Sequence, residues 1–316
     1  MKGYTGKKVA MIIPTYNQIK LLEKCINSLK KTTSYKNYKI YVVDDSGEGK
    51  IGKEIKRKFK DVEVVINKKN LGCSKTMNIG IKIAKEKYNP DYFLILNDDT
   101  EVFQRDWLKN LVALSEKDKD IGIMGCKLVY SDRRMQNAGG FLEKWNISKL
   151  SEIGKEDLLD VDHIMGAFML IKKEVIRKIG GFDEDFSPYL LEDTDYCLRA
   201  KEKGFKIKSY GGVEVIHQAH QSLKNLKDPK LFFRFKNDIL FSWRHLSFSN
   251  FIFRVFVYLP SVALFKKVSD ESSLEIKNLR IREELLSNLG YLFKAYLFVL
   301  WKKIKSEDKI EAWCSK

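Results

Sequence analysis

Three acidic clusters and one late histidine are the residues of this chain best suited to chemistry. The first two clusters, Asp44-Asp45 and Asp98-Asp99, each follow a short apolar run, and His217 ends the segment VEVIH. The third cluster lies in LLEDTDYCLR. Carboxylates at the carboxyl ends of parallel strands lie where open α/β sheets bind their ligands. We therefore expect a metal, a nucleotide or both at this edge.

The elements that must position these residues follow from hydrophobic spacing. Short apolar runs alternate with segments of helical spacing, which is typical of βαβ units. The sequence therefore predicts an α/β fold with a Rossmann-like, mostly parallel sheet and flanking helices. The expected strands are 8–13, 38–43, 62–66, 92–96, 121–130, 163–171, 207–210 and 213–217, and the expected helices are 19–29, 50–59, one capped by Ser74 and ending at Lys87, one starting at Asp106, 174–179 and 192–203.

The chain divides into an α/β domain at 1–223 and a helical, amphipathic region at 224–316. The second region holds 18 Lys/Arg and 10 Asp/Glu, a net charge of +8. Ser272 and Glu275 form a capping box before a long helix that ends near 304. The apolar runs are too short or too interrupted to span a bilayer. This composition suits helices lying on an anionic membrane surface; packing on the core or on a second subunit, as in a homodimer, is the alternative.

The net charge and the cysteine pattern limit which partners and which cell compartment we expect. The 316 residues carry a net charge of +16, which suggests an anionic partner such as nucleotide phosphates, nucleic acid or lipid, or simply a Lys-rich surface. Five scattered cysteines without CxxC spacing argue against a disulfide scaffold or a zinc site. The polar start and the short apolar run 9–13 predict no signal peptide. We expect a cytoplasmic protein, peripheral at the inner face of the membrane.

The first cluster could bind a nucleotide. Neighbouring strand ends would bring Thr15 and Tyr16 beside Asp44 and Asp45, where a carboxylate can accept from a nucleobase N–H and Tyr16 can cover the ring. Asp-Ser-Gly is also a common turn sequence, which is the ordinary explanation.

The other clusters could bind a metal and move a proton. A carboxylate such as Asp99 beside a diphosphate needs a bridging cation, and Mg²⁺ and Mn²⁺ prefer oxygen ligands. The ordinary explanation is a loop before the next helix. Asp193 could act as a general base, although acids at a helix start also simply favour the helix dipole. His217 could complete a mixed carboxylate and imidazole site for Mn²⁺.

The order and spacing of these motifs resemble glycosyltransferase family 2, enzymes with the GT-A fold. The resemblance runs from about Val9 to His217 and covers IIPTYN, VVDDS, NLGCSKTMNIGI and LILNDDTEV. The block GAFMLIKKEVIRKIGGFDEDF, followed by LEDTDYCLRAKEKGFK and VIH, resembles the rhamnosyltransferase-like branch. The sequence departs from the family's DXD motif because Asn97 stands where the first Asp would be. This leaves Asp99 as the single direct carboxylate and puts a metal contact by Asp98 in doubt.

The resemblance implies an inverting, metal-dependent glycosyltransferase with Mn²⁺ or Mg²⁺ as cofactor. The donor would be a nucleotide-diphosphate sugar, and the acceptor a saccharide that is often lipid-linked, in cell-surface polysaccharide or glycan synthesis. The implied roles are catalysis by the base Asp193; nucleotide binding by Pro14, Thr15, Tyr16, Asp44, Asp45, Gly72, Asn78 and Asp98; metal binding by Asp99 and His217; and acceptor binding by Gly166, Ala167 and Glu192.

Two other classes of function share some of these features. A nucleotidyltransferase also uses strand-end carboxylates, but it would need a Gly-rich, basic phosphate loop near the N-terminus, and the sequence has none. A nucleic-acid-binding protein could use the basic surface, but no recognisable motif accompanies the basic and aromatic residues of the helical region. We therefore expect no nucleic-acid partner.

Overall fold

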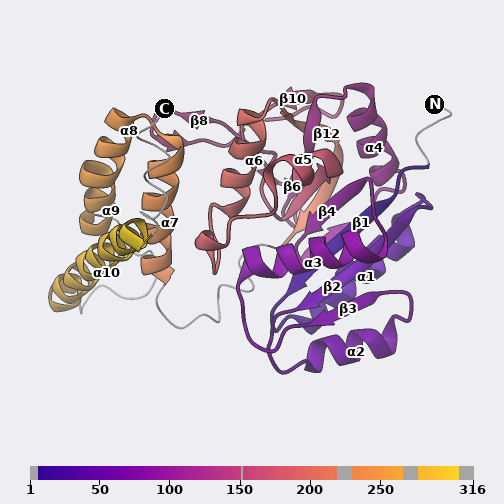
Figure 1. The fold of residues 1–316 in the computed structure, drawn as a ribbon, viewed down its shortest axis with the longest axis horizontal. Coiled ribbons are helices and arrows are strands. Elements are labelled where there is room, and N and C mark those ends of the chain that lie inside the picture. Colours follow the sequence, from indigo (N-terminus) through magenta and orange to yellow (C-terminus); the bar gives the residue numbers. More distant parts are fainter. Residues whose placement is uncertain (1–5, 151, 219–229, 266–276, 306–316) are drawn as a thin grey trace. The chain divides into compact units, whose positions relative to one another are not determined.

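The computed structural model describes residues 6–150, 152–218, 230–265 and 277–305 (Figure 1). The chain separates into two compact units, Met1–Asn225 and Leu226–Lys316. The division lies close to the one expected at 223/224. Each unit is described by itself.

The first unit is built on a mixed, mostly parallel sheet, which confirms the predicted α/β class. In the described residues the sheet has ten strands, ordered β10-β12-β6-β11-β4-β1-β2-β3, while β5 pairs with β12 and β7 pairs with β6. A separate hairpin joins β8 to β9. The strands are β1 (Val9–Thr15), β2 (Tyr38–Asp44), β3 (Glu63–Ile66), β4 (Tyr92–Leu96), β5 (Thr100–Val102), β6 (Ile121–Val129), β7 (Met135–Asn137), β8 (Leu142–Glu143), β9 (Asn146–Ile147), β10 (Leu158–Asp160), β11 (Phe168–Lys172) and β12 (Lys206–His217).

The parallel half of the sheet brings the first two acidic clusters to one edge. Strands β1 and β2 run parallel with Thr15 opposite Asp44. Strand β4 runs parallel to β1 on its other side, with Ile12 opposite Ile95. The carboxyl ends of these three strands therefore meet, as the sequence predicts.

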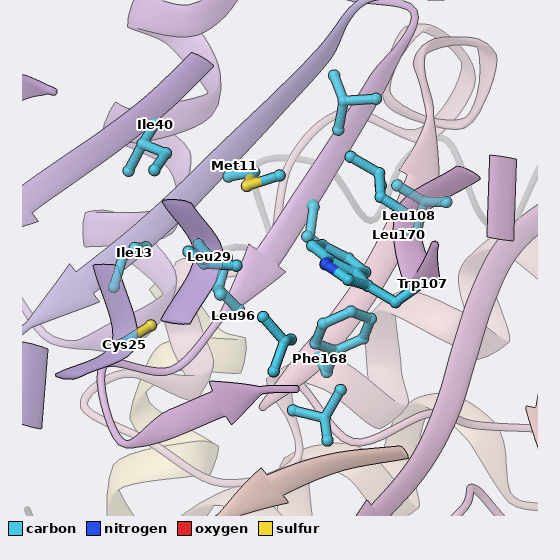
Figure 2. Close-up of a cluster of buried hydrophobic side chains, with 14 of the residues drawn as sticks. Met11, Ile13, Cys25, Leu29, Ile40, Leu96, Trp107, Leu108, Phe168 and Leu170 are labelled. Carbon is cyan, nitrogen blue, oxygen red and sulfur yellow. The ribbon is translucent and has the colours of Figure 1, made fainter. Parts of the chain in front are cut away.

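Helices cover both faces of the sheet. One face packs on α1, α2 and α4, around side chains such as Met11, Leu29 and Trp107. Figure 2 shows Trp107 beside Phe168 in this cluster, with ring centroids 5.5 Å apart. The other face packs on α3, α5 and α6, around Ile12 and its neighbours. The helices are α1 (Ile19–Thr32), α2 (Lys50–Lys58), α3 (Cys73–Lys87), α4 (Trp107–Lys117), α5 (Lys173–Ile179) and α6 (Glu192–Glu202).

The structure differs from the prediction in several details. The strand expected at 163–171 begins only at Phe168. The two last strands are one, β12, with an irregular register between Tyr210 and Glu214. The segment after Asp99 forms the short strand β5, which a pattern of three residues does not predict. The residue before α3 is Gly72, and Ser74 lies buried inside the helix and does not cap it.

The second unit is helical, as expected. Its helices are α7 (Lys230–His245), α8 (Phe248–Phe253), α9 (Leu259–Phe265) and α10 (Lys277–Lys305), and a π-helical segment, Arg254–Tyr258, joins α8 to α9. Phe235, Ile239 and Leu292 are among the side chains of its small core. The capping box expected at 272–275 lies outside the described residues. Among the described helices, none is long and apolar enough to cross a membrane.

Candidate active site

The segment after β4 is a tight turn that presents two carboxylates. Thr100 closes the turn, since its backbone N–H and its hydroxyl both donate to the Asn97 carbonyl, at 3.3 and 2.8 Å. Asp98 and Asp99 sit inside the turn and are almost fully buried. The turn leads into strand β5, so more than a plain loop separates β4 from the next helix.

The Asp98 carboxylate is bound to the end of β1. The Thr15 hydroxyl donates to Asp98 Oδ2 at 2.6 Å. Burial raises the pKa of Asp98 to about 7, opposed by the Thr15 hydrogen bond. Asp98 thus joins the ends of β1 and β4, and its bonding is separate from that of Asp99.

Asp99 faces His217. Its Oδ1 atom lies 3.3 Å from His217 Nε2 and accepts no hydrogen bond, although it is buried. The Asn97 amide nitrogen is also 3.3 Å from Nε2. The other ring nitrogen, Nδ1, lies 2.6 Å from Gln136 Oε1. The two residues expected to bind a metal are therefore in contact.

His217 lies 118 residues after Asp99 in the sequence, and strand pairing brings the two side chains together. The last residue of β12 pairs antiparallel with the first residue of β5, so that His217 lies opposite Thr100. The Gln218 N–H then donates to the Asp99 carbonyl at 3.1 Å. Because β5 directly follows the turn, this register fixes His217 beside Asp99.

The expected base, Asp193, lies half-buried in the first turn of α6. Its Oδ2 accepts from the Gly166 N–H at 2.7 Å, and its Oδ1 accepts from the Thr194 N–H at 2.7 Å. A Cβ atom on residue 166 would approach Asp193 Cβ to 3.2 Å and Oδ2 to 3.4 Å. A glycine therefore allows the carboxylate its close contact with the loop.

The start of α6 is held in a strained conformation. Leu190 and Leu191 have φ values of 81° and 69°, which cost roughly 1–3 kcal/mol each for residues with bulky side chains. Farther along, buried Asp195 accepts from Arg199 at 2.8 Å, and the same guanidinium binds the Ile179 and Gly181 carbonyls. Asp195 thus holds the guanidinium that joins α6 to the end of α5.

A short path of bonds connects Asp193 to the Asp99–His217 pair. The Asn97 N–H donates to the Ala167 carbonyl at 3.1 Å. Ala167 follows Gly166, which binds Asp193. Two of the three residues expected on the acceptor side therefore lie between the Asp99 turn and Asp193. Glu192 is buried beside Asp193 and hydrogen-bonds the Cys73 thiol.

Both carboxylates of the first cluster bind loops. Fully buried Asp44 accepts from the Ser46 and Gly52 N–H groups at 3.0 and 2.7 Å. Asp45 accepts from the Leu71 and Gly72 N–H groups at 3.0 Å each. These bonds fix the loops that follow β2 and β3, which is the turn chemistry considered from the sequence. Direct contact of either carboxylate with a nucleotide stays a prediction.

The remaining nucleotide-side candidates differ in their surroundings. Asn78 binds the backbone N–H and carbonyl of Phe182, both at 2.8 Å, so its amide joins α3 to the loop after α5. Its expected nucleotide contact stays a prediction. Pro14 and Tyr16 are half-buried at the end of β1. Gly72, with a φ of 84°, packs against Pro188 so closely that a Cβ atom would lie 2.8 Å from Pro188 Cα.

The donor set at Asp99 and His217 fits a divalent cation. A buried carboxylate oxygen without a hydrogen bond faces an imidazole nitrogen, and both are ligands of Mn²⁺. No group of three or more His, Cys, Asp or Glu residues in the described part of the chain could hold a metal. Mg²⁺ usually takes one or two carboxylates and completes its coordination with water and substrate phosphates. A cavity of about 330 Å³ borders His217 and is lined by Tyr130, Ser131, Asp132, Arg134, His217 and Gln218.

Gln136 is a residue of this site that sequence reasoning missed. It binds the His217 ring from β7, a strand of three residues inside a polar stretch. Nothing in the local pattern distinguishes it from neighbouring polar residues, so only the fold reveals it.

Comparison with known proteins places the chain. The model of "Glycosyl transferase family 2" matches residues 10–180, and that of "N-terminal domain of galactosyltransferase" matches residues 156–221. Rhamnosyltransferase WbbL of Escherichia coli K12 is 26% identical over 227 residues, which are 67% of this chain and 84% of WbbL. The uncharacterized protein y4gI of Sinorhizobium fredii is 24% identical over 278 residues; the match covers 81% of this chain but only 29% of y4gI.

A solved structure supports the fold. The mannosyltransferase PcManGT of Pyrobaculum calidifontis, determined with GDP-Man and Mn²⁺, superposes with a TM-score of 0.55 at 16% identity, covering 94% of this chain and 88% of PcManGT. This likeness confirms the GT-A fold. With a family match over more than half of its length, the chain belongs to glycosyltransferase family 2.

Proposed function

We propose that this enzyme is an inverting, metal-dependent glycosyltransferase. It would transfer a hexose or deoxyhexose from a nucleotide-diphosphate sugar to a saccharide hydroxyl, in the synthesis of a cell-surface polysaccharide or glycan. The observation that carries the proposal is the buried, unbonded Asp99 Oδ1 atom 3.3 Å from His217 Nε2. A buried carboxylate oxygen is costly without a partner, and a cation bound with the diphosphate would provide one.

Asp99 and His217 would hold the Mn²⁺ or Mg²⁺. When bound, the ion would neutralise charge that builds on the departing diphosphate. Asp98, bound to Thr15, would keep the turn attached to β1. These separate roles of Asp98 and Asp99 agree with the sequence, in which Asn97 stands where the first Asp of the DXD motif would be.

Asp193 would be the general base. Oδ1 accepts both the N–H and the hydroxyl of Thr194, whereas Oδ2 accepts only the Gly166 N–H and retains a second lone pair. The acceptor hydroxyl would donate to such a lone pair beside Gly166 and Ala167. Its oxygen would then attack the anomeric carbon on the face opposite the leaving diphosphate, which inverts the configuration.

Nucleotide recognition would fall to the ends of β1 and β2. Tyr16 is the half-exposed aromatic side chain there and would cover the base. Asp44 and Asp45 would shape the pocket through the loops that they bind, together with Gly72.

A donor screen tests this function. UDP-, dTDP- and GDP-sugars are incubated with the protein and Mn²⁺, and release of nucleoside diphosphate is measured. We expect one donor class to be hydrolysed, with activity lost in EDTA and in Asp99→Asn. Asp91→Asn is the control, because Asp91 precedes β4 at the opposite end of the strand and accepts the Lys8 N–H at 2.7 Å. This variant should keep the activity. Release that survives both EDTA and Asp99→Asn would contradict the proposal.

We further propose that the C-terminal unit binds an anionic membrane surface. Exposed apolar side chains recur along α10 at Leu289, Phe293, Leu297 and Leu300. Spacings of four, four and three place them on one side of the helix. Membrane binding would bring the enzyme to a lipid-linked acceptor.

Aromatic contacts extend this apolar stripe to the other helices. The rings of Trp243, Phe251, Phe256 and Tyr296 follow one another at centroid distances of 5.3, 6.4 and 6.0 Å. Phe256 is 58% exposed and Trp243 52%. These ring contacts connect the exposed aromatic side chains of α7 and the π-helical segment to α10 by way of Phe251 on α8.

The charge of the unit selects an anionic surface. Within 231–263 and 287–302 there are six basic residues and one acidic residue, Asp238, which is paired with Arg254 at 2.6 Å. An interfacial helix binds through both its apolar face and its attraction to anionic lipids.

Cosedimentation with phosphatidylglycerol and phosphatidylcholine vesicles tests this. We expect salt-sensitive binding to the anionic vesicles only, lost in Phe293→Glu and kept in Phe103→Glu, a matched change on the catalytic unit. Absence of vesicle binding by the intact chain would contradict the proposal, and a dimer dissociated by Phe293→Glu would reassign the face to a second copy.

A further inference from the structure

We propose that Gln136 is a positioning residue that locks the ring orientation and tautomer of His217, so that Nε2 offers its lone pair to the cation. The inference rests on the proposed metal-dependent function and deepens it. It concerns a residue outside every motif that the family resemblance covers.

Gln136 contacts His217 twice. Its Oε1 atom lies 2.6 Å from Nδ1 of the ring, and its Nε2 atom lies 3.4 Å from the His217 backbone carbonyl. The carbonyl can only accept, so the amide NH₂ must face it. The amide oxygen must then face Nδ1, which means that Nδ1 carries the proton and donates.

The second ring nitrogen is thereby left as an acceptor. Its surroundings agree, because the Asn97 amide NH₂ can donate to it at 3.3 Å. Asp99 Oδ1, also an acceptor, lies 3.3 Å away on the same nitrogen. Two lone pairs that face each other repel unless a cation lies between them. With this tautomer, Nε2 of His217 has no proton to donate to Asp99. The two residues are therefore suited to binding a metal ion and not to a hydrogen bond with each other.

The backbone of β7 is irregular at this residue. Leu128 pairs with Asn137 and Val129 pairs with Met135, so Gln136 is the extra residue between two consecutive pairs. Such a bulge redirects a side chain and is common beside active sites. A regular strand would place this residue opposite β6, whereas the bulge leaves its amide free to reach His217.

The tautomer can be observed directly. The chain has four histidines, so ¹⁵N-histidine labelling gives a simple spectrum, and His217→Ala assigns the signals of interest. In the metal-free wild-type protein at pH 8.5 we expect a protonated Nδ1 and an unprotonated Nε2. A His217 ring protonated on Nε2 would overturn the proposal.

Metal affinity supplies the second readout. Binding of Mn²⁺ alone is followed by electron paramagnetic resonance of the free ion. Loss of an outer partner of a histidine ligand typically weakens metal binding about 10- to 100-fold. We expect this loss in Gln136→Leu. Gln136→Glu should keep most of the affinity, because its carboxylate still accepts from Nδ1.

Gln104→Leu is the matched control. Gln104 also holds β12, through the Gly212 carbonyl at 3.0 Å and the Glu214 N–H at 2.8 Å, but it does not contact His217. We expect its Mn²⁺ affinity to equal that of the wild type. Equal losses in Gln104→Leu and Gln136→Leu would mean that only strand stability matters, and unchanged affinity in Gln136→Leu would also refute the lock.

The outcomes separate the two proposals. A wild-type protein that binds no Mn²⁺ contradicts the metal-dependent function itself. A wild-type protein that binds Mn²⁺ while Gln136→Leu binds it equally contradicts the role of Gln136 alone. Should Gln136→Leu fail to fold, the wild-type tautomer and Gln136→Glu decide.

Discussion

Replacement of Asp193 by asparagine perturbs the proposed base while keeping its size. Both carboxylate oxygens accept backbone N–H groups, Oδ2 from Gly166 and Oδ1 from Thr194, each at 2.7 Å. An asparagine has one acceptor oxygen and one NH₂ group. One of the two backbone N–H groups must therefore lose its partner and face another donor.

Two effects follow, and they have different magnitudes. Loss of a general base lowers turnover about 10²- to 10⁴-fold. Loss of one hydrogen bond at this half-buried position should lower the free energy of unfolding by about 1 kcal/mol. We therefore expect kcat to fall at least a hundredfold, with a small loss of stability and no change in nucleotide affinity.

The assay measures kcat by nucleoside diphosphate release, nucleotide Kd by calorimetry and stability by urea denaturation. Thr194→Val is the matched control, since it removes only the 3.2 Å contact from the Thr194 hydroxyl to Asp193 Oδ1 and keeps the backbone N–H. Near-normal turnover in Asp193→Asn would refute the assignment. An equal fall in Thr194→Val would show that local geometry, and not the base, controls the rate.

Three further predictions concern the same helix start and its supports. Gly166→Ala should displace the Asp193 carboxylate, because the new Cβ would lie 3.2 Å from Asp193 Cβ; we expect kcat to fall about tenfold with an unchanged nucleotide Kd, since small misplacements of a catalytic group are costly. Arg199→Met leaves the buried Asp195 carboxylate without its cation, so urea denaturation should register a loss of about 3 kcal/mol. Burial and nearby acidic groups hold the pKa of the Cys73 thiol well above its usual range, so its alkylation at pH 8 should be far slower than that of a free thiol and should rise with pH up to pH 10; fast alkylation at pH 8 would contradict that environment.

The parallel strands at the centre of the sheet could be predicted because their local hydrophobic pattern matches their buried position in the fold. The runs that became β1, β2 and β4 are buried on both faces, so they read as continuous apolar segments that stop at a polar residue. Their shared edge follows from parallel pairing alone. The places of Thr15, Asp44 and Asp98 were therefore accessible from the sequence.

The contact of His217 with Asp99 could be predicted only from the family resemblance. The contact with Asp99 depends on antiparallel pairing of β12 with β5. Strand β5 has three residues, too few for a periodic signal. A long-range register of this kind is decided by tertiary packing, so neither composition nor spacing reveals it.

The hydrogen-bond partners of the individual polar side chains were the least predictable feature. Asp45 and Asn78 bind backbone groups that are 27 and 104 residues away in the sequence, whereas Asp44 binds the backbone of the turn and helix that directly follow β2. A carboxylate that satisfies buried N–H groups has the same sequence signature as one that binds a ligand. The role of Gln136 follows from a bulge, which no local pattern indicates.

The anomeric configuration of the product tests the central claim most directly. With the donor identified by hydrolysis and a saccharide acceptor supplied, ¹H NMR of the newly formed glycoside reports the configuration at the transferred carbon. A single displacement assisted by Asp193 and a cation at Asp99 and His217 predicts a Mn²⁺-dependent product with the configuration inverted relative to the donor. A product of retained configuration, or one formed equally well in EDTA, would contradict the account.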